Sequence, residues 1–148
     1  MTVSGGVYKI KAPEDSAGHG HKTNLRSMNI QSHKAGGKAI AEVISDDTIV
    51  HNTDDALNLL GNIYYQGFDG LILHRKNITT DFFDLKNKMA GDILQKFSNY
   101  RMRLAIAGDF SAFTSKSLRD FIYESNKGKH VNFVASVTEA LEVFSADS

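Results

Sequence analysis

The chain has 148 residues, of which 41% are hydrophobic, and this length and composition suit one globular domain. Its 17 basic and 17 acidic residues give a formal net charge of zero, which argues against nucleic-acid binding because such proteins usually carry excess basic charge. The absence of cysteine excludes disulfides and thiolate metal sites, and no apolar stretch approaches the roughly 20 residues that a membrane-spanning helix needs. We therefore expect a cytoplasmic protein without membrane insertion, and no metal or cofactor is predicted.

The first 27 residues differ in composition from the rest. They contain the only proline, Pro13, and two closely spaced histidines, His19 and His21, among small, polar and charged residues. This composition predicts a disordered leader, or an extension added to the natural chain. The two histidines form a short tract of the kind that is more often solvated than metal-binding. We expect one folded domain over residues 28–148.

The patterned part of the sequence begins with two strands joined by a turn. Strand-like runs occupy residues 29–33 and 38–44, and Gly36 and Gly37 lie between them. Paired glycines between such runs predict a β-hairpin.

A helix is predicted after this hairpin. Asn52 or Thr53 is its expected cap, and Gly67 is its expected end. The predicted buried stripe comprises Ala56, Leu57, Leu60, Ile63 and Tyr64.

The central strand and a long helix follow. The run from Gly70 to His74 is short and apolar, which is typical of an interior parallel strand. Residues 81–99 then carry apolar side chains three and four positions apart, a spacing that predicts one helix. Members of this stripe are Phe82, Leu85, Met89, Ile93 and Phe97.

The last third of the chain repeats the alternation of strand and helix. Strands are predicted over residues 102–107 and 130–135, with a helix over residues 115–126 between them. Ser136 begins a final helix, and Glu139 completes a capping box. The order predicts an α/β fold with a mixed, mostly parallel sheet of about five strands, an N-terminal hairpin and four helices.

The first candidate binding site is the segment after the strand 102–107. It comprises Asp109, Thr114, Ser115, Lys116 and Ser117. Hydroxyls, backbone amides and a lysine at a helix start are suited to binding an anion. Serine and threonine at this place also act simply as helix caps, and both interpretations stay open.

The second candidate site follows the central strand. His74, Arg75, Asp81 and Asp84 supply a histidine, a cation and two carboxylates, the groups used in acid and base catalysis. The simpler interpretation is structural, because Asp81 and Asp84 also suit the start of a helix, where the dipole favours negative charge.

Three segments resemble a known bacterial family without an established activity, the domain-of-unknown-function family 4180. They are residues 81–85 (DFFDL), 91–97 (GDILQKF) and 114–126 (TSKSLRDFIYESN). The resemblance covers Met28 to about Phe144. It implies a shared fold and no particular reaction.

The order of elements also resembles the STAS and SpoIIAA-like fold, which includes regulatory domains of sulfate transporters and antagonists of anti-sigma factors. In the antagonists, a phosphorylated serine in an Asp-Ser context follows a central strand. The comparable segment here is Asn77 to Leu85, which has Thr79 and Thr80 but no Asp-Ser pair. The missing pair argues against the usual phosphorylation switch, and a non-phosphorylated docking surface is compatible with the resemblance.

Our leading hypothesis is a small regulatory or binding module that engages a protein partner or a small anionic ligand through its strand-end loops. The candidate binding residues are Asp109, Thr114, Ser115, Lys116, Ser117, Thr79, Thr80 and Asp81. The alternative is an enzyme that acts on an anionic substrate with Asp109 or Asp81 as general base and Lys116 as an anion donor. A purely structural subunit and a homodimer are left open.

Overall fold

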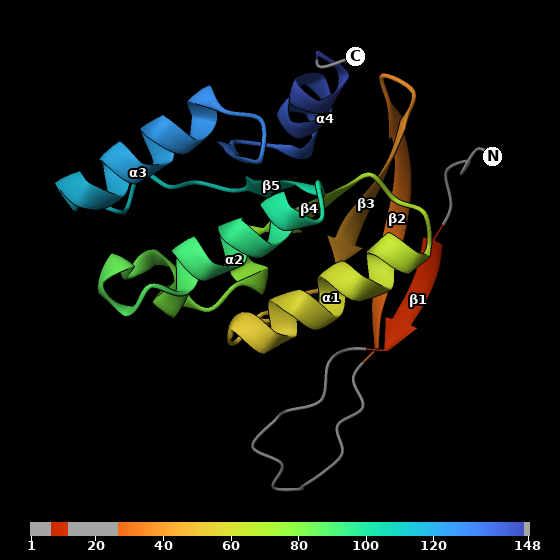
Figure 1. Ribbon diagram of the computed structural model, residues 1–148, viewed down its shortest axis with the longest axis horizontal. Coiled ribbons are helices and arrows are strands. Elements are labelled where there is room, and N and C mark those ends of the chain that lie inside the picture. Colours follow the sequence, from red (N-terminus) through yellow and green to blue (C-terminus); the bar gives the residue numbers. More distant parts are fainter. Residues whose placement is uncertain (1–6, 12–26, 147–148) are drawn as a thin grey trace, which may run out of the picture.

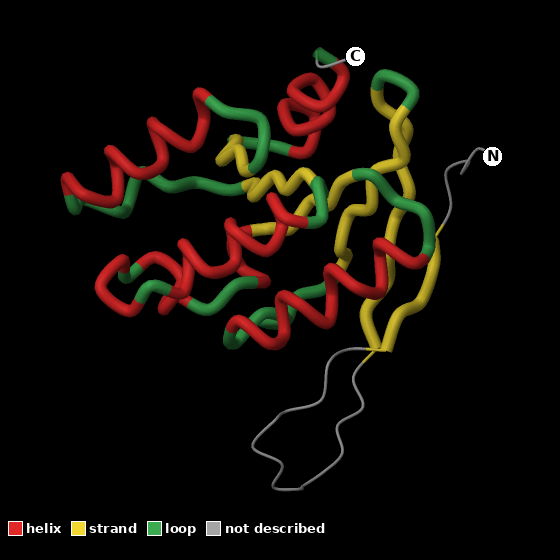
Figure 2. The backbone as a smooth tube through the Cα atoms, viewed as in Figure 1, coloured by secondary structure: helices red, strands yellow, loops and turns green. Residues whose placement is uncertain are grey.

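One mixed sheet organises the computed structural model, which describes residues 7–11 and 27–146 (Figures 1 and 2). Its strands are β1 (Val7–Lys11), β2 (Ser27–Ala35), β3 (Lys38–Ile44), β4 (Gly70–His74), β5 (Arg103–Ala107) and β6 (Val131–Val134), arranged in chain order. The pairs β1–β2 and β2–β3 are antiparallel, and the three later pairs are parallel. The predicted α/β class, mixed sheet, hairpin and four α-helices are thus confirmed.

The strand β1 lies inside the segment for which the sequence predicts a disordered leader. Residues 7–11 pair with β2 from Val7 opposite Gln31 to Lys11 opposite Ser27, so the sheet has one strand more than expected. The run VYKIK alternates and is rich in residues that favour strands, and the edge of β2 offers unpaired backbone groups to such a segment. His19 and His21 lie outside the described residues.

The first helix, α1 (Thr53–Tyr65), begins where the sequence predicts. The side chain of Asn52 caps it, because Oδ1 accepts a hydrogen bond from the backbone N–H of Asp55 at 2.8 Å. Tyr64 was expected in the buried stripe but is 50% exposed, whereas Leu59 is fully buried. Neighbouring residues of a helix point about 100° apart, so Tyr64 turns away from the core that Ile63 enters and rests against Tyr100.

The long helix predicted over residues 81–99 is wrong in its first half. Only α2 (Met89–Asn99) is an α-helix, and three short 3₁₀ turns precede it: η1 (Arg75–Asn77), η2 (Thr80–Phe83) and η3 (Leu85–Asn87). The carboxylate of Asp84 accepts the N–H of Lys86, and the side-chain oxygen of Asn87 accepts the N–H of Met89. These local bonds compete with a helix, and Lys88 adopts a left-handed conformation with φ of 64°. The apolar spacing nevertheless directs Phe82 and Phe83 into the core.

Serine caps begin the last two helices, α3 (Lys116–Lys127) and α4 (Val137–Ser145). The hydroxyl of Ser115 accepts the N–H of Leu118, and that of Ser136 accepts the N–H of Glu139. One of the two hydrogen bonds of the capping box predicted for α4, from the Glu139 N–H to the Ser136 hydroxyl, is therefore present. The carboxylate of Glu139 reaches one residue further back than predicted, because it accepts the N–H of Ala135 at 2.8 Å.

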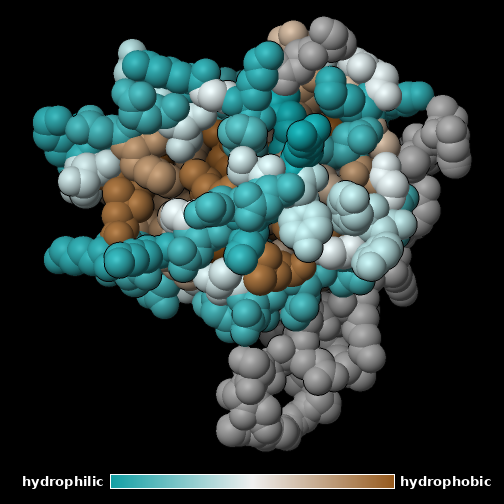
Figure 3. All heavy atoms as spheres, in the orientation of Figure 1, coloured by the Kyte–Doolittle hydropathy of each residue, from teal (hydrophilic) through white to brown (hydrophobic). Residues whose placement is uncertain are grey.

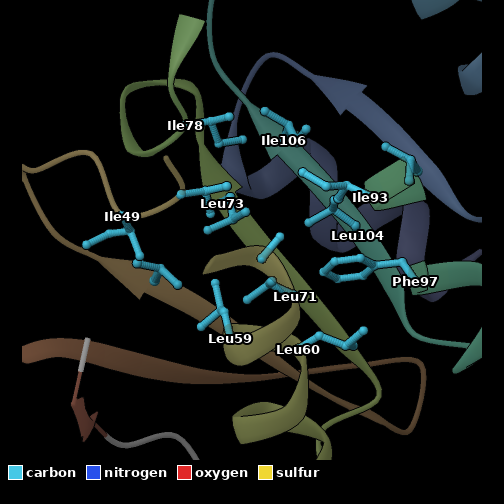
Figure 4. Packing of buried hydrophobic residues seen from close by; sticks show 14 of the residues in the cluster. Ile49, Leu59, Leu60, Leu71, Leu73, Ile78, Ile93, Phe97, Leu104 and Ile106 are labelled. Carbon is cyan, nitrogen blue, oxygen red and sulfur yellow. The ribbon is translucent and has the colours of Figure 1, made fainter. Parts of the chain in front are cut away.

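The helices divide unequally between the two faces of the sheet. A parallel sheet in chain order with right-handed crossovers places the crossover helices on one face. Residues of α1, α2 and α3 accordingly share the larger hydrophobic cluster, in which Leu71 and Leu73 of β4 point toward Leu59 of α1 (Figure 4). The smaller cluster, on the opposite face, is closed by Ala140 and Phe144 of α4.

The edge strand β6 is partly covered by the side chain of Asn126 on α3. Asn126 Oδ1 accepts the backbone N–H of Phe133 at 2.7 Å, and its Nδ2 donates to the carbonyl oxygen of Phe133 at 3.2 Å. The amide thereby occupies the two backbone groups to which a further strand would bind.

We expect Asn126→Ala to increase self-association, because it uncovers the Phe133 backbone at the sheet edge. Light scattering over a concentration series would measure the effect, and Ser125→Ala on the same helix is the control. A variant that stays as monodisperse as the control would contradict this role of Asn126.

Candidate functional site

A cavity of about 390 Å³ lies where the chain leaves β3, β4 and β5. Its lining combines cationic, hydroxyl and apolar side chains: Thr48, His51, Arg75, Lys76, Ile78, Thr79, Thr80, Phe83 and Phe113. Open α/β sheets usually bind ligands at the carboxyl ends of their strands, and the volume lies in the range of small-molecule sites. This cavity is therefore the candidate functional site.

Asn77 joins the two walls of the cavity and is itself fully buried. Its Nδ2 donates to the carbonyl oxygens of Ser45 and Asp47 at 3.0 and 2.9 Å, and its Oδ1 accepts the N–H of His74 at 3.1 Å. Its carbonyl oxygen accepts the N–H groups of Ile49 and Val50. Four of these five hydrogen bonds connect the segment after β3 to the segment after β4, and the bond to His74 holds Asn77 to the end of β4.

Among the basic side chains that line the cavity, Arg75 is the one without an ion pair to a described residue. Its guanidinium carbon lies 5.1 Å from the centre of the Phe113 ring, and its Nε is buried without a hydrogen-bond partner among the described residues. A Cβ atom at Gly108 would lie 2.7 Å from the Cβ of Arg75, so only glycine lets the end of β5 approach this closely. Arg75 is thus held at the cavity with donor capacity to spare.

The other two basic side chains of the cavity already have acidic partners. Lys76 Nζ lies 3.0 Å from Asp46 Oδ1, and His51 Nδ1 lies 3.0 Å from Asp55 Oδ2. The Asp55 carboxylate is buried and also accepts the backbone N–H of His51 at 2.9 Å. These contacts fix the imidazole at the rim of the cavity. Arg75 remains the group best placed to bind an added anion.

Of the eight candidate binding residues named from sequence, Thr79 and Thr80 line this cavity, and so does Arg75 of the second candidate site. Asp81 follows them in η2, and its backbone N–H donates to Thr79 Oγ1 at 3.3 Å. Thr79 therefore caps η2 with its hydroxyl at the cavity wall. Thr79 and Thr80 thus lie at the cavity, and their part in binding stays a prediction. Their partner from the next loop is Phe113, which was not predicted.

The other predicted group is exposed and lies outside the cavity lining: Asp109, Thr114, Ser115, Lys116 and Ser117. Ser115 acts as the α3 cap, and Lys116 Nζ pairs with Asp120 Oδ2 at 2.8 Å along the same helix. Their contacts correspond to the structural interpretation of the segment. Their role in binding stays a prediction.

Asp109 has a pKa below its ordinary value. The hydroxyl and the backbone N–H of Ser111 hydrogen-bond to its carboxylate, Arg75 adds a weaker attraction, and slight desolvation opposes both. A carboxylate with a lowered pKa is a weaker general base. Because the folded-state pKa is depressed, this charge stabilises the fold above the unfolded-state pKa, and the contribution is lost as pH falls through the folded-state pKa.

We expect Ser111→Ala to raise the pKa of Asp109 toward its ordinary value, with the backbone N–H keeping part of the shift. An NMR titration of the Asp109 carboxyl carbon would measure this change. Ser117→Ala, in the same region of the chain, is the control. An unchanged pKa in Ser111→Ala would show that the hydroxyl is not the principal cause.

Sequence analysis did not predict a second polar cluster, which lies on the face of the sheet opposite α1, α2 and α3. The two carboxylate oxygens of the buried Glu42 each form a hydrogen bond with a different imidazole. His33 Nε2 lies 2.8 Å from one oxygen, and His74 Nε2 lies 2.7 Å from the other. The three residues come from β2, β3 and β4, so no local spacing relates them. The one available signal was a glutamate inside an otherwise apolar strand. Among the described residues, no three histidine or carboxylate side chains are placed to hold a metal ion.

Hydrophobic side chains reach the surface along the seam between α3 and the segment that contains α2 (Figure 3). Phe110, Phe113 and Phe121 are only partly buried there. The rings of Phe83 and Phe113 stack with centres 4.7 Å apart and planes 23° apart. An aromatic surface thus continues from the hydrophobic core to the cavity.

Comparisons with known proteins bear on the family rather than on the chemistry. None of the described helices is both long and apolar enough to span a bilayer. Neither the curated proteins nor the solved structures include a match to the sequence. The sequence pattern of a family described as domain of unknown function (DUF4180) matches residues 35–144, which is most of the chain. The chain therefore belongs to the DUF4180 family.

Proposed function

We propose that this protein is a small cytoplasmic binding or regulatory module, with a STAS-like fold, that engages an anion at the cavity between the loops after β3, β4 and β5. The anion belongs to a small ligand or to an acidic group of a protein partner. The observation that carries the proposal is Arg75, whose guanidinium lies at the cavity and whose buried Nε has no hydrogen-bond partner in the described part of the chain.

The chemistry of the surrounding groups supports an anionic ligand. A guanidinium offers a planar fork of donors that matches the oxygens of phosphate or carboxylate. The hydroxyls of Thr48 and Thr80 add donors on the same lining, and His51 adds an imidazole. Partial burial strengthens such charge-assisted bonds relative to those on an open surface.

The geometry gives less support to the enzyme alternative. That hypothesis requires Asp109 or Asp81 to lie close to Lys116 in a cleft shielded from water. Lys116 instead pairs with Asp120, and all of these side chains are exposed. Binding therefore remains the proposal, and the test below measures binding directly.

We expect Arg75→Met to weaken binding of inorganic phosphate or sulfate by about tenfold or more, because a hydrogen bond to a charged group is worth about 1.5–3 kcal/mol. Amide NMR titrations would measure the affinity and locate the site through shifts at Thr79 and Thr80. Arg119→Met removes an exposed arginine of α3 and is the matched control. Equal affinity in the two variants, or shifts confined to residues outside the cavity, would refute the proposed site.

A further inference from the structure

We infer that the ligand of this cavity joins its anionic group directly to a flat aromatic ring. This inference rests on the proposed function and names the chemical class that the same site would select. Its basis is the pairing of a cation with an aromatic wall: Arg75 lies over the Phe113 ring, and Phe113 stacks on Phe83.

The cavity is divided between two kinds of surface. Arg75 and the threonine hydroxyls provide donors, whereas Phe83, Phe113 and Ile78 provide apolar surface. An inorganic anion would satisfy only the donors, and water would remain against the two rings. A ligand that covers both surfaces gains from apolar burial as well as from charge.

The arrangement of the rings favours a planar aromatic body over an aliphatic one. Phe113 is only partly buried, so part of its ring surface remains accessible. Phe83 is buried and holds Phe113 from the side of the core at a ring separation of 4.7 Å. A ring already fixed by packing loses little freedom when a second ring stacks on it.

The closeness of cation and ring limits the length of the ligand. The guanidinium carbon of Arg75 is 5.1 Å from the centre of the Phe113 ring, so an anion that binds the guanidinium lies next to any group that contacts Phe113. The anion and the aromatic ring are thus adjacent within one ligand. A free aryl phosphate or carboxylate and a phosphorylated tyrosine side chain share this chemistry.

The test compares four probes by calorimetry on the full chain: phenyl phosphate, cyclohexyl phosphate, inorganic phosphate and benzyl alcohol. We expect phenyl phosphate to bind about tenfold more tightly than inorganic phosphate, and more tightly than cyclohexyl phosphate. Phe113→Leu, which keeps apolar bulk but removes the ring, should abolish this advantage, so that the variant binds phenyl phosphate and inorganic phosphate with equal affinity. Phe110→Leu is the matched control, since Phe110 packs on Phe83, Phe113 and Phe133 but does not line the cavity.

The outcomes separate this inference from the proposed function. Equal affinity of phenyl and inorganic phosphate at the Arg75 site would overturn the inference and leave the proposed function standing, as would equal affinity of phenyl and cyclohexyl phosphate. Binding of benzyl alcohol as tight as that of phenyl phosphate, or no binding of any anion, would overturn both. Should Phe113→Leu fail to fold, nuclear Overhauser contacts from the phenyl protons to the Phe113 ring of the unchanged protein decide the matter, and their absence would refute the inference.

If phenyl phosphate binds as expected, a phosphotyrosine peptide and its unphosphorylated form distinguish the source of the aryl anion. Tighter binding of the phosphopeptide than of phenyl phosphate supports an aryl anion carried by a protein partner. Tighter binding of phenyl phosphate supports a free small molecule. Failure of both to exceed inorganic phosphate would again refute the inference.

Discussion

Replacing Phe144 by alanine is expected to lower the free energy of unfolding by about 4 kcal/mol. Phe144 is fully buried and belongs to the smaller hydrophobic cluster, on the face that α4 covers. Its ring lies beside Gly70 of β4, and the guanidinium carbon of Arg103 is 5.1 Å from the ring centre. A helix as short as α4 is not stable alone, so its docking depends on this side chain.

The composition of this cluster explains why repacking would not recover the stability lost in Phe144→Ala. Its other members include several alanines, whose short side chains cannot move into the volume that the ring vacates. Burial already lowers the pKa of Arg103, and loss of the Phe144 ring would admit water to that guanidinium. Urea unfolding followed by circular dichroism would measure the change in stability.

Tyr65→Ala is the control for this prediction. Tyr65 is 88% exposed on α1, and its removal should change stability by less than about 0.5 kcal/mol. A loss below about 1 kcal/mol in Phe144→Ala would show that α4 contributes little to the fold, contrary to the large truncation costs typical of buried aromatics.

Much of the fold follows from local patterns in the sequence. The apolar run from Gly70 to His74 became an interior strand with the predicted bounds, and the polar caps Asn52, Ser115 and Ser136 begin three of the helices. These features depend on neighbouring residues, which is why single-sequence reasoning detects them. The STAS-like fold is a finer statement than the family match supports, and it stays a prediction.

The segment between β4 and α2 shows where local patterns fail. The spacing of Phe82, Leu85 and Met89 suits a helix, yet the same side chains reach the core from 3₁₀ turns. The side chains of Asp84 and Asn87 accept hydrogen bonds from backbone N–H groups that a helix would have used. The spacing of apolar residues does not reveal this competition. The error matters for function, because these turns form a wall of the cavity.

The candidate site was only half predictable for a related reason. Thr79 and Thr80 follow a recognisable central strand, so their position at a strand end could be inferred. Phe113 comes from the next loop and meets Arg75 only through the tertiary fold. The carboxylate of Glu42 likewise meets His33 and His74 across three strands, and register, rather than spacing, brings them together.

Asn77→Ala should cost about 3 kcal/mol or more of stability, because each buried polar group left without a partner costs about 1–3 kcal/mol. The change removes the side-chain bonds to the carbonyl oxygens of Ser45 and Asp47 and to the N–H of His74. The segment after β3 would then be held to the segment after β4 by backbone bonds, including Ile49 N–H to the carbonyl of residue 77, and by the exposed ion pair of Lys76 and Asp46.

The same substitution is also expected to weaken anion binding, although Asn77 does not line the cavity. Thr48 and His51 lie on the segment after β3, and Arg75 lies on the segment after β4. Loss of the Asn77 side-chain bonds between these segments lowers the fraction of molecules in which the three binding groups lie close together. Asn77→Asp is the informative second variant, since it keeps the acceptor for His74 but loses both donors. Urea unfolding and phosphate titration of the two variants would separate the effects. Full phosphate affinity in a destabilised but folded Asn77→Ala would show that the walls of the cavity do not need this tether, and the binding groups would then have to be positioned by the 3₁₀ turns themselves.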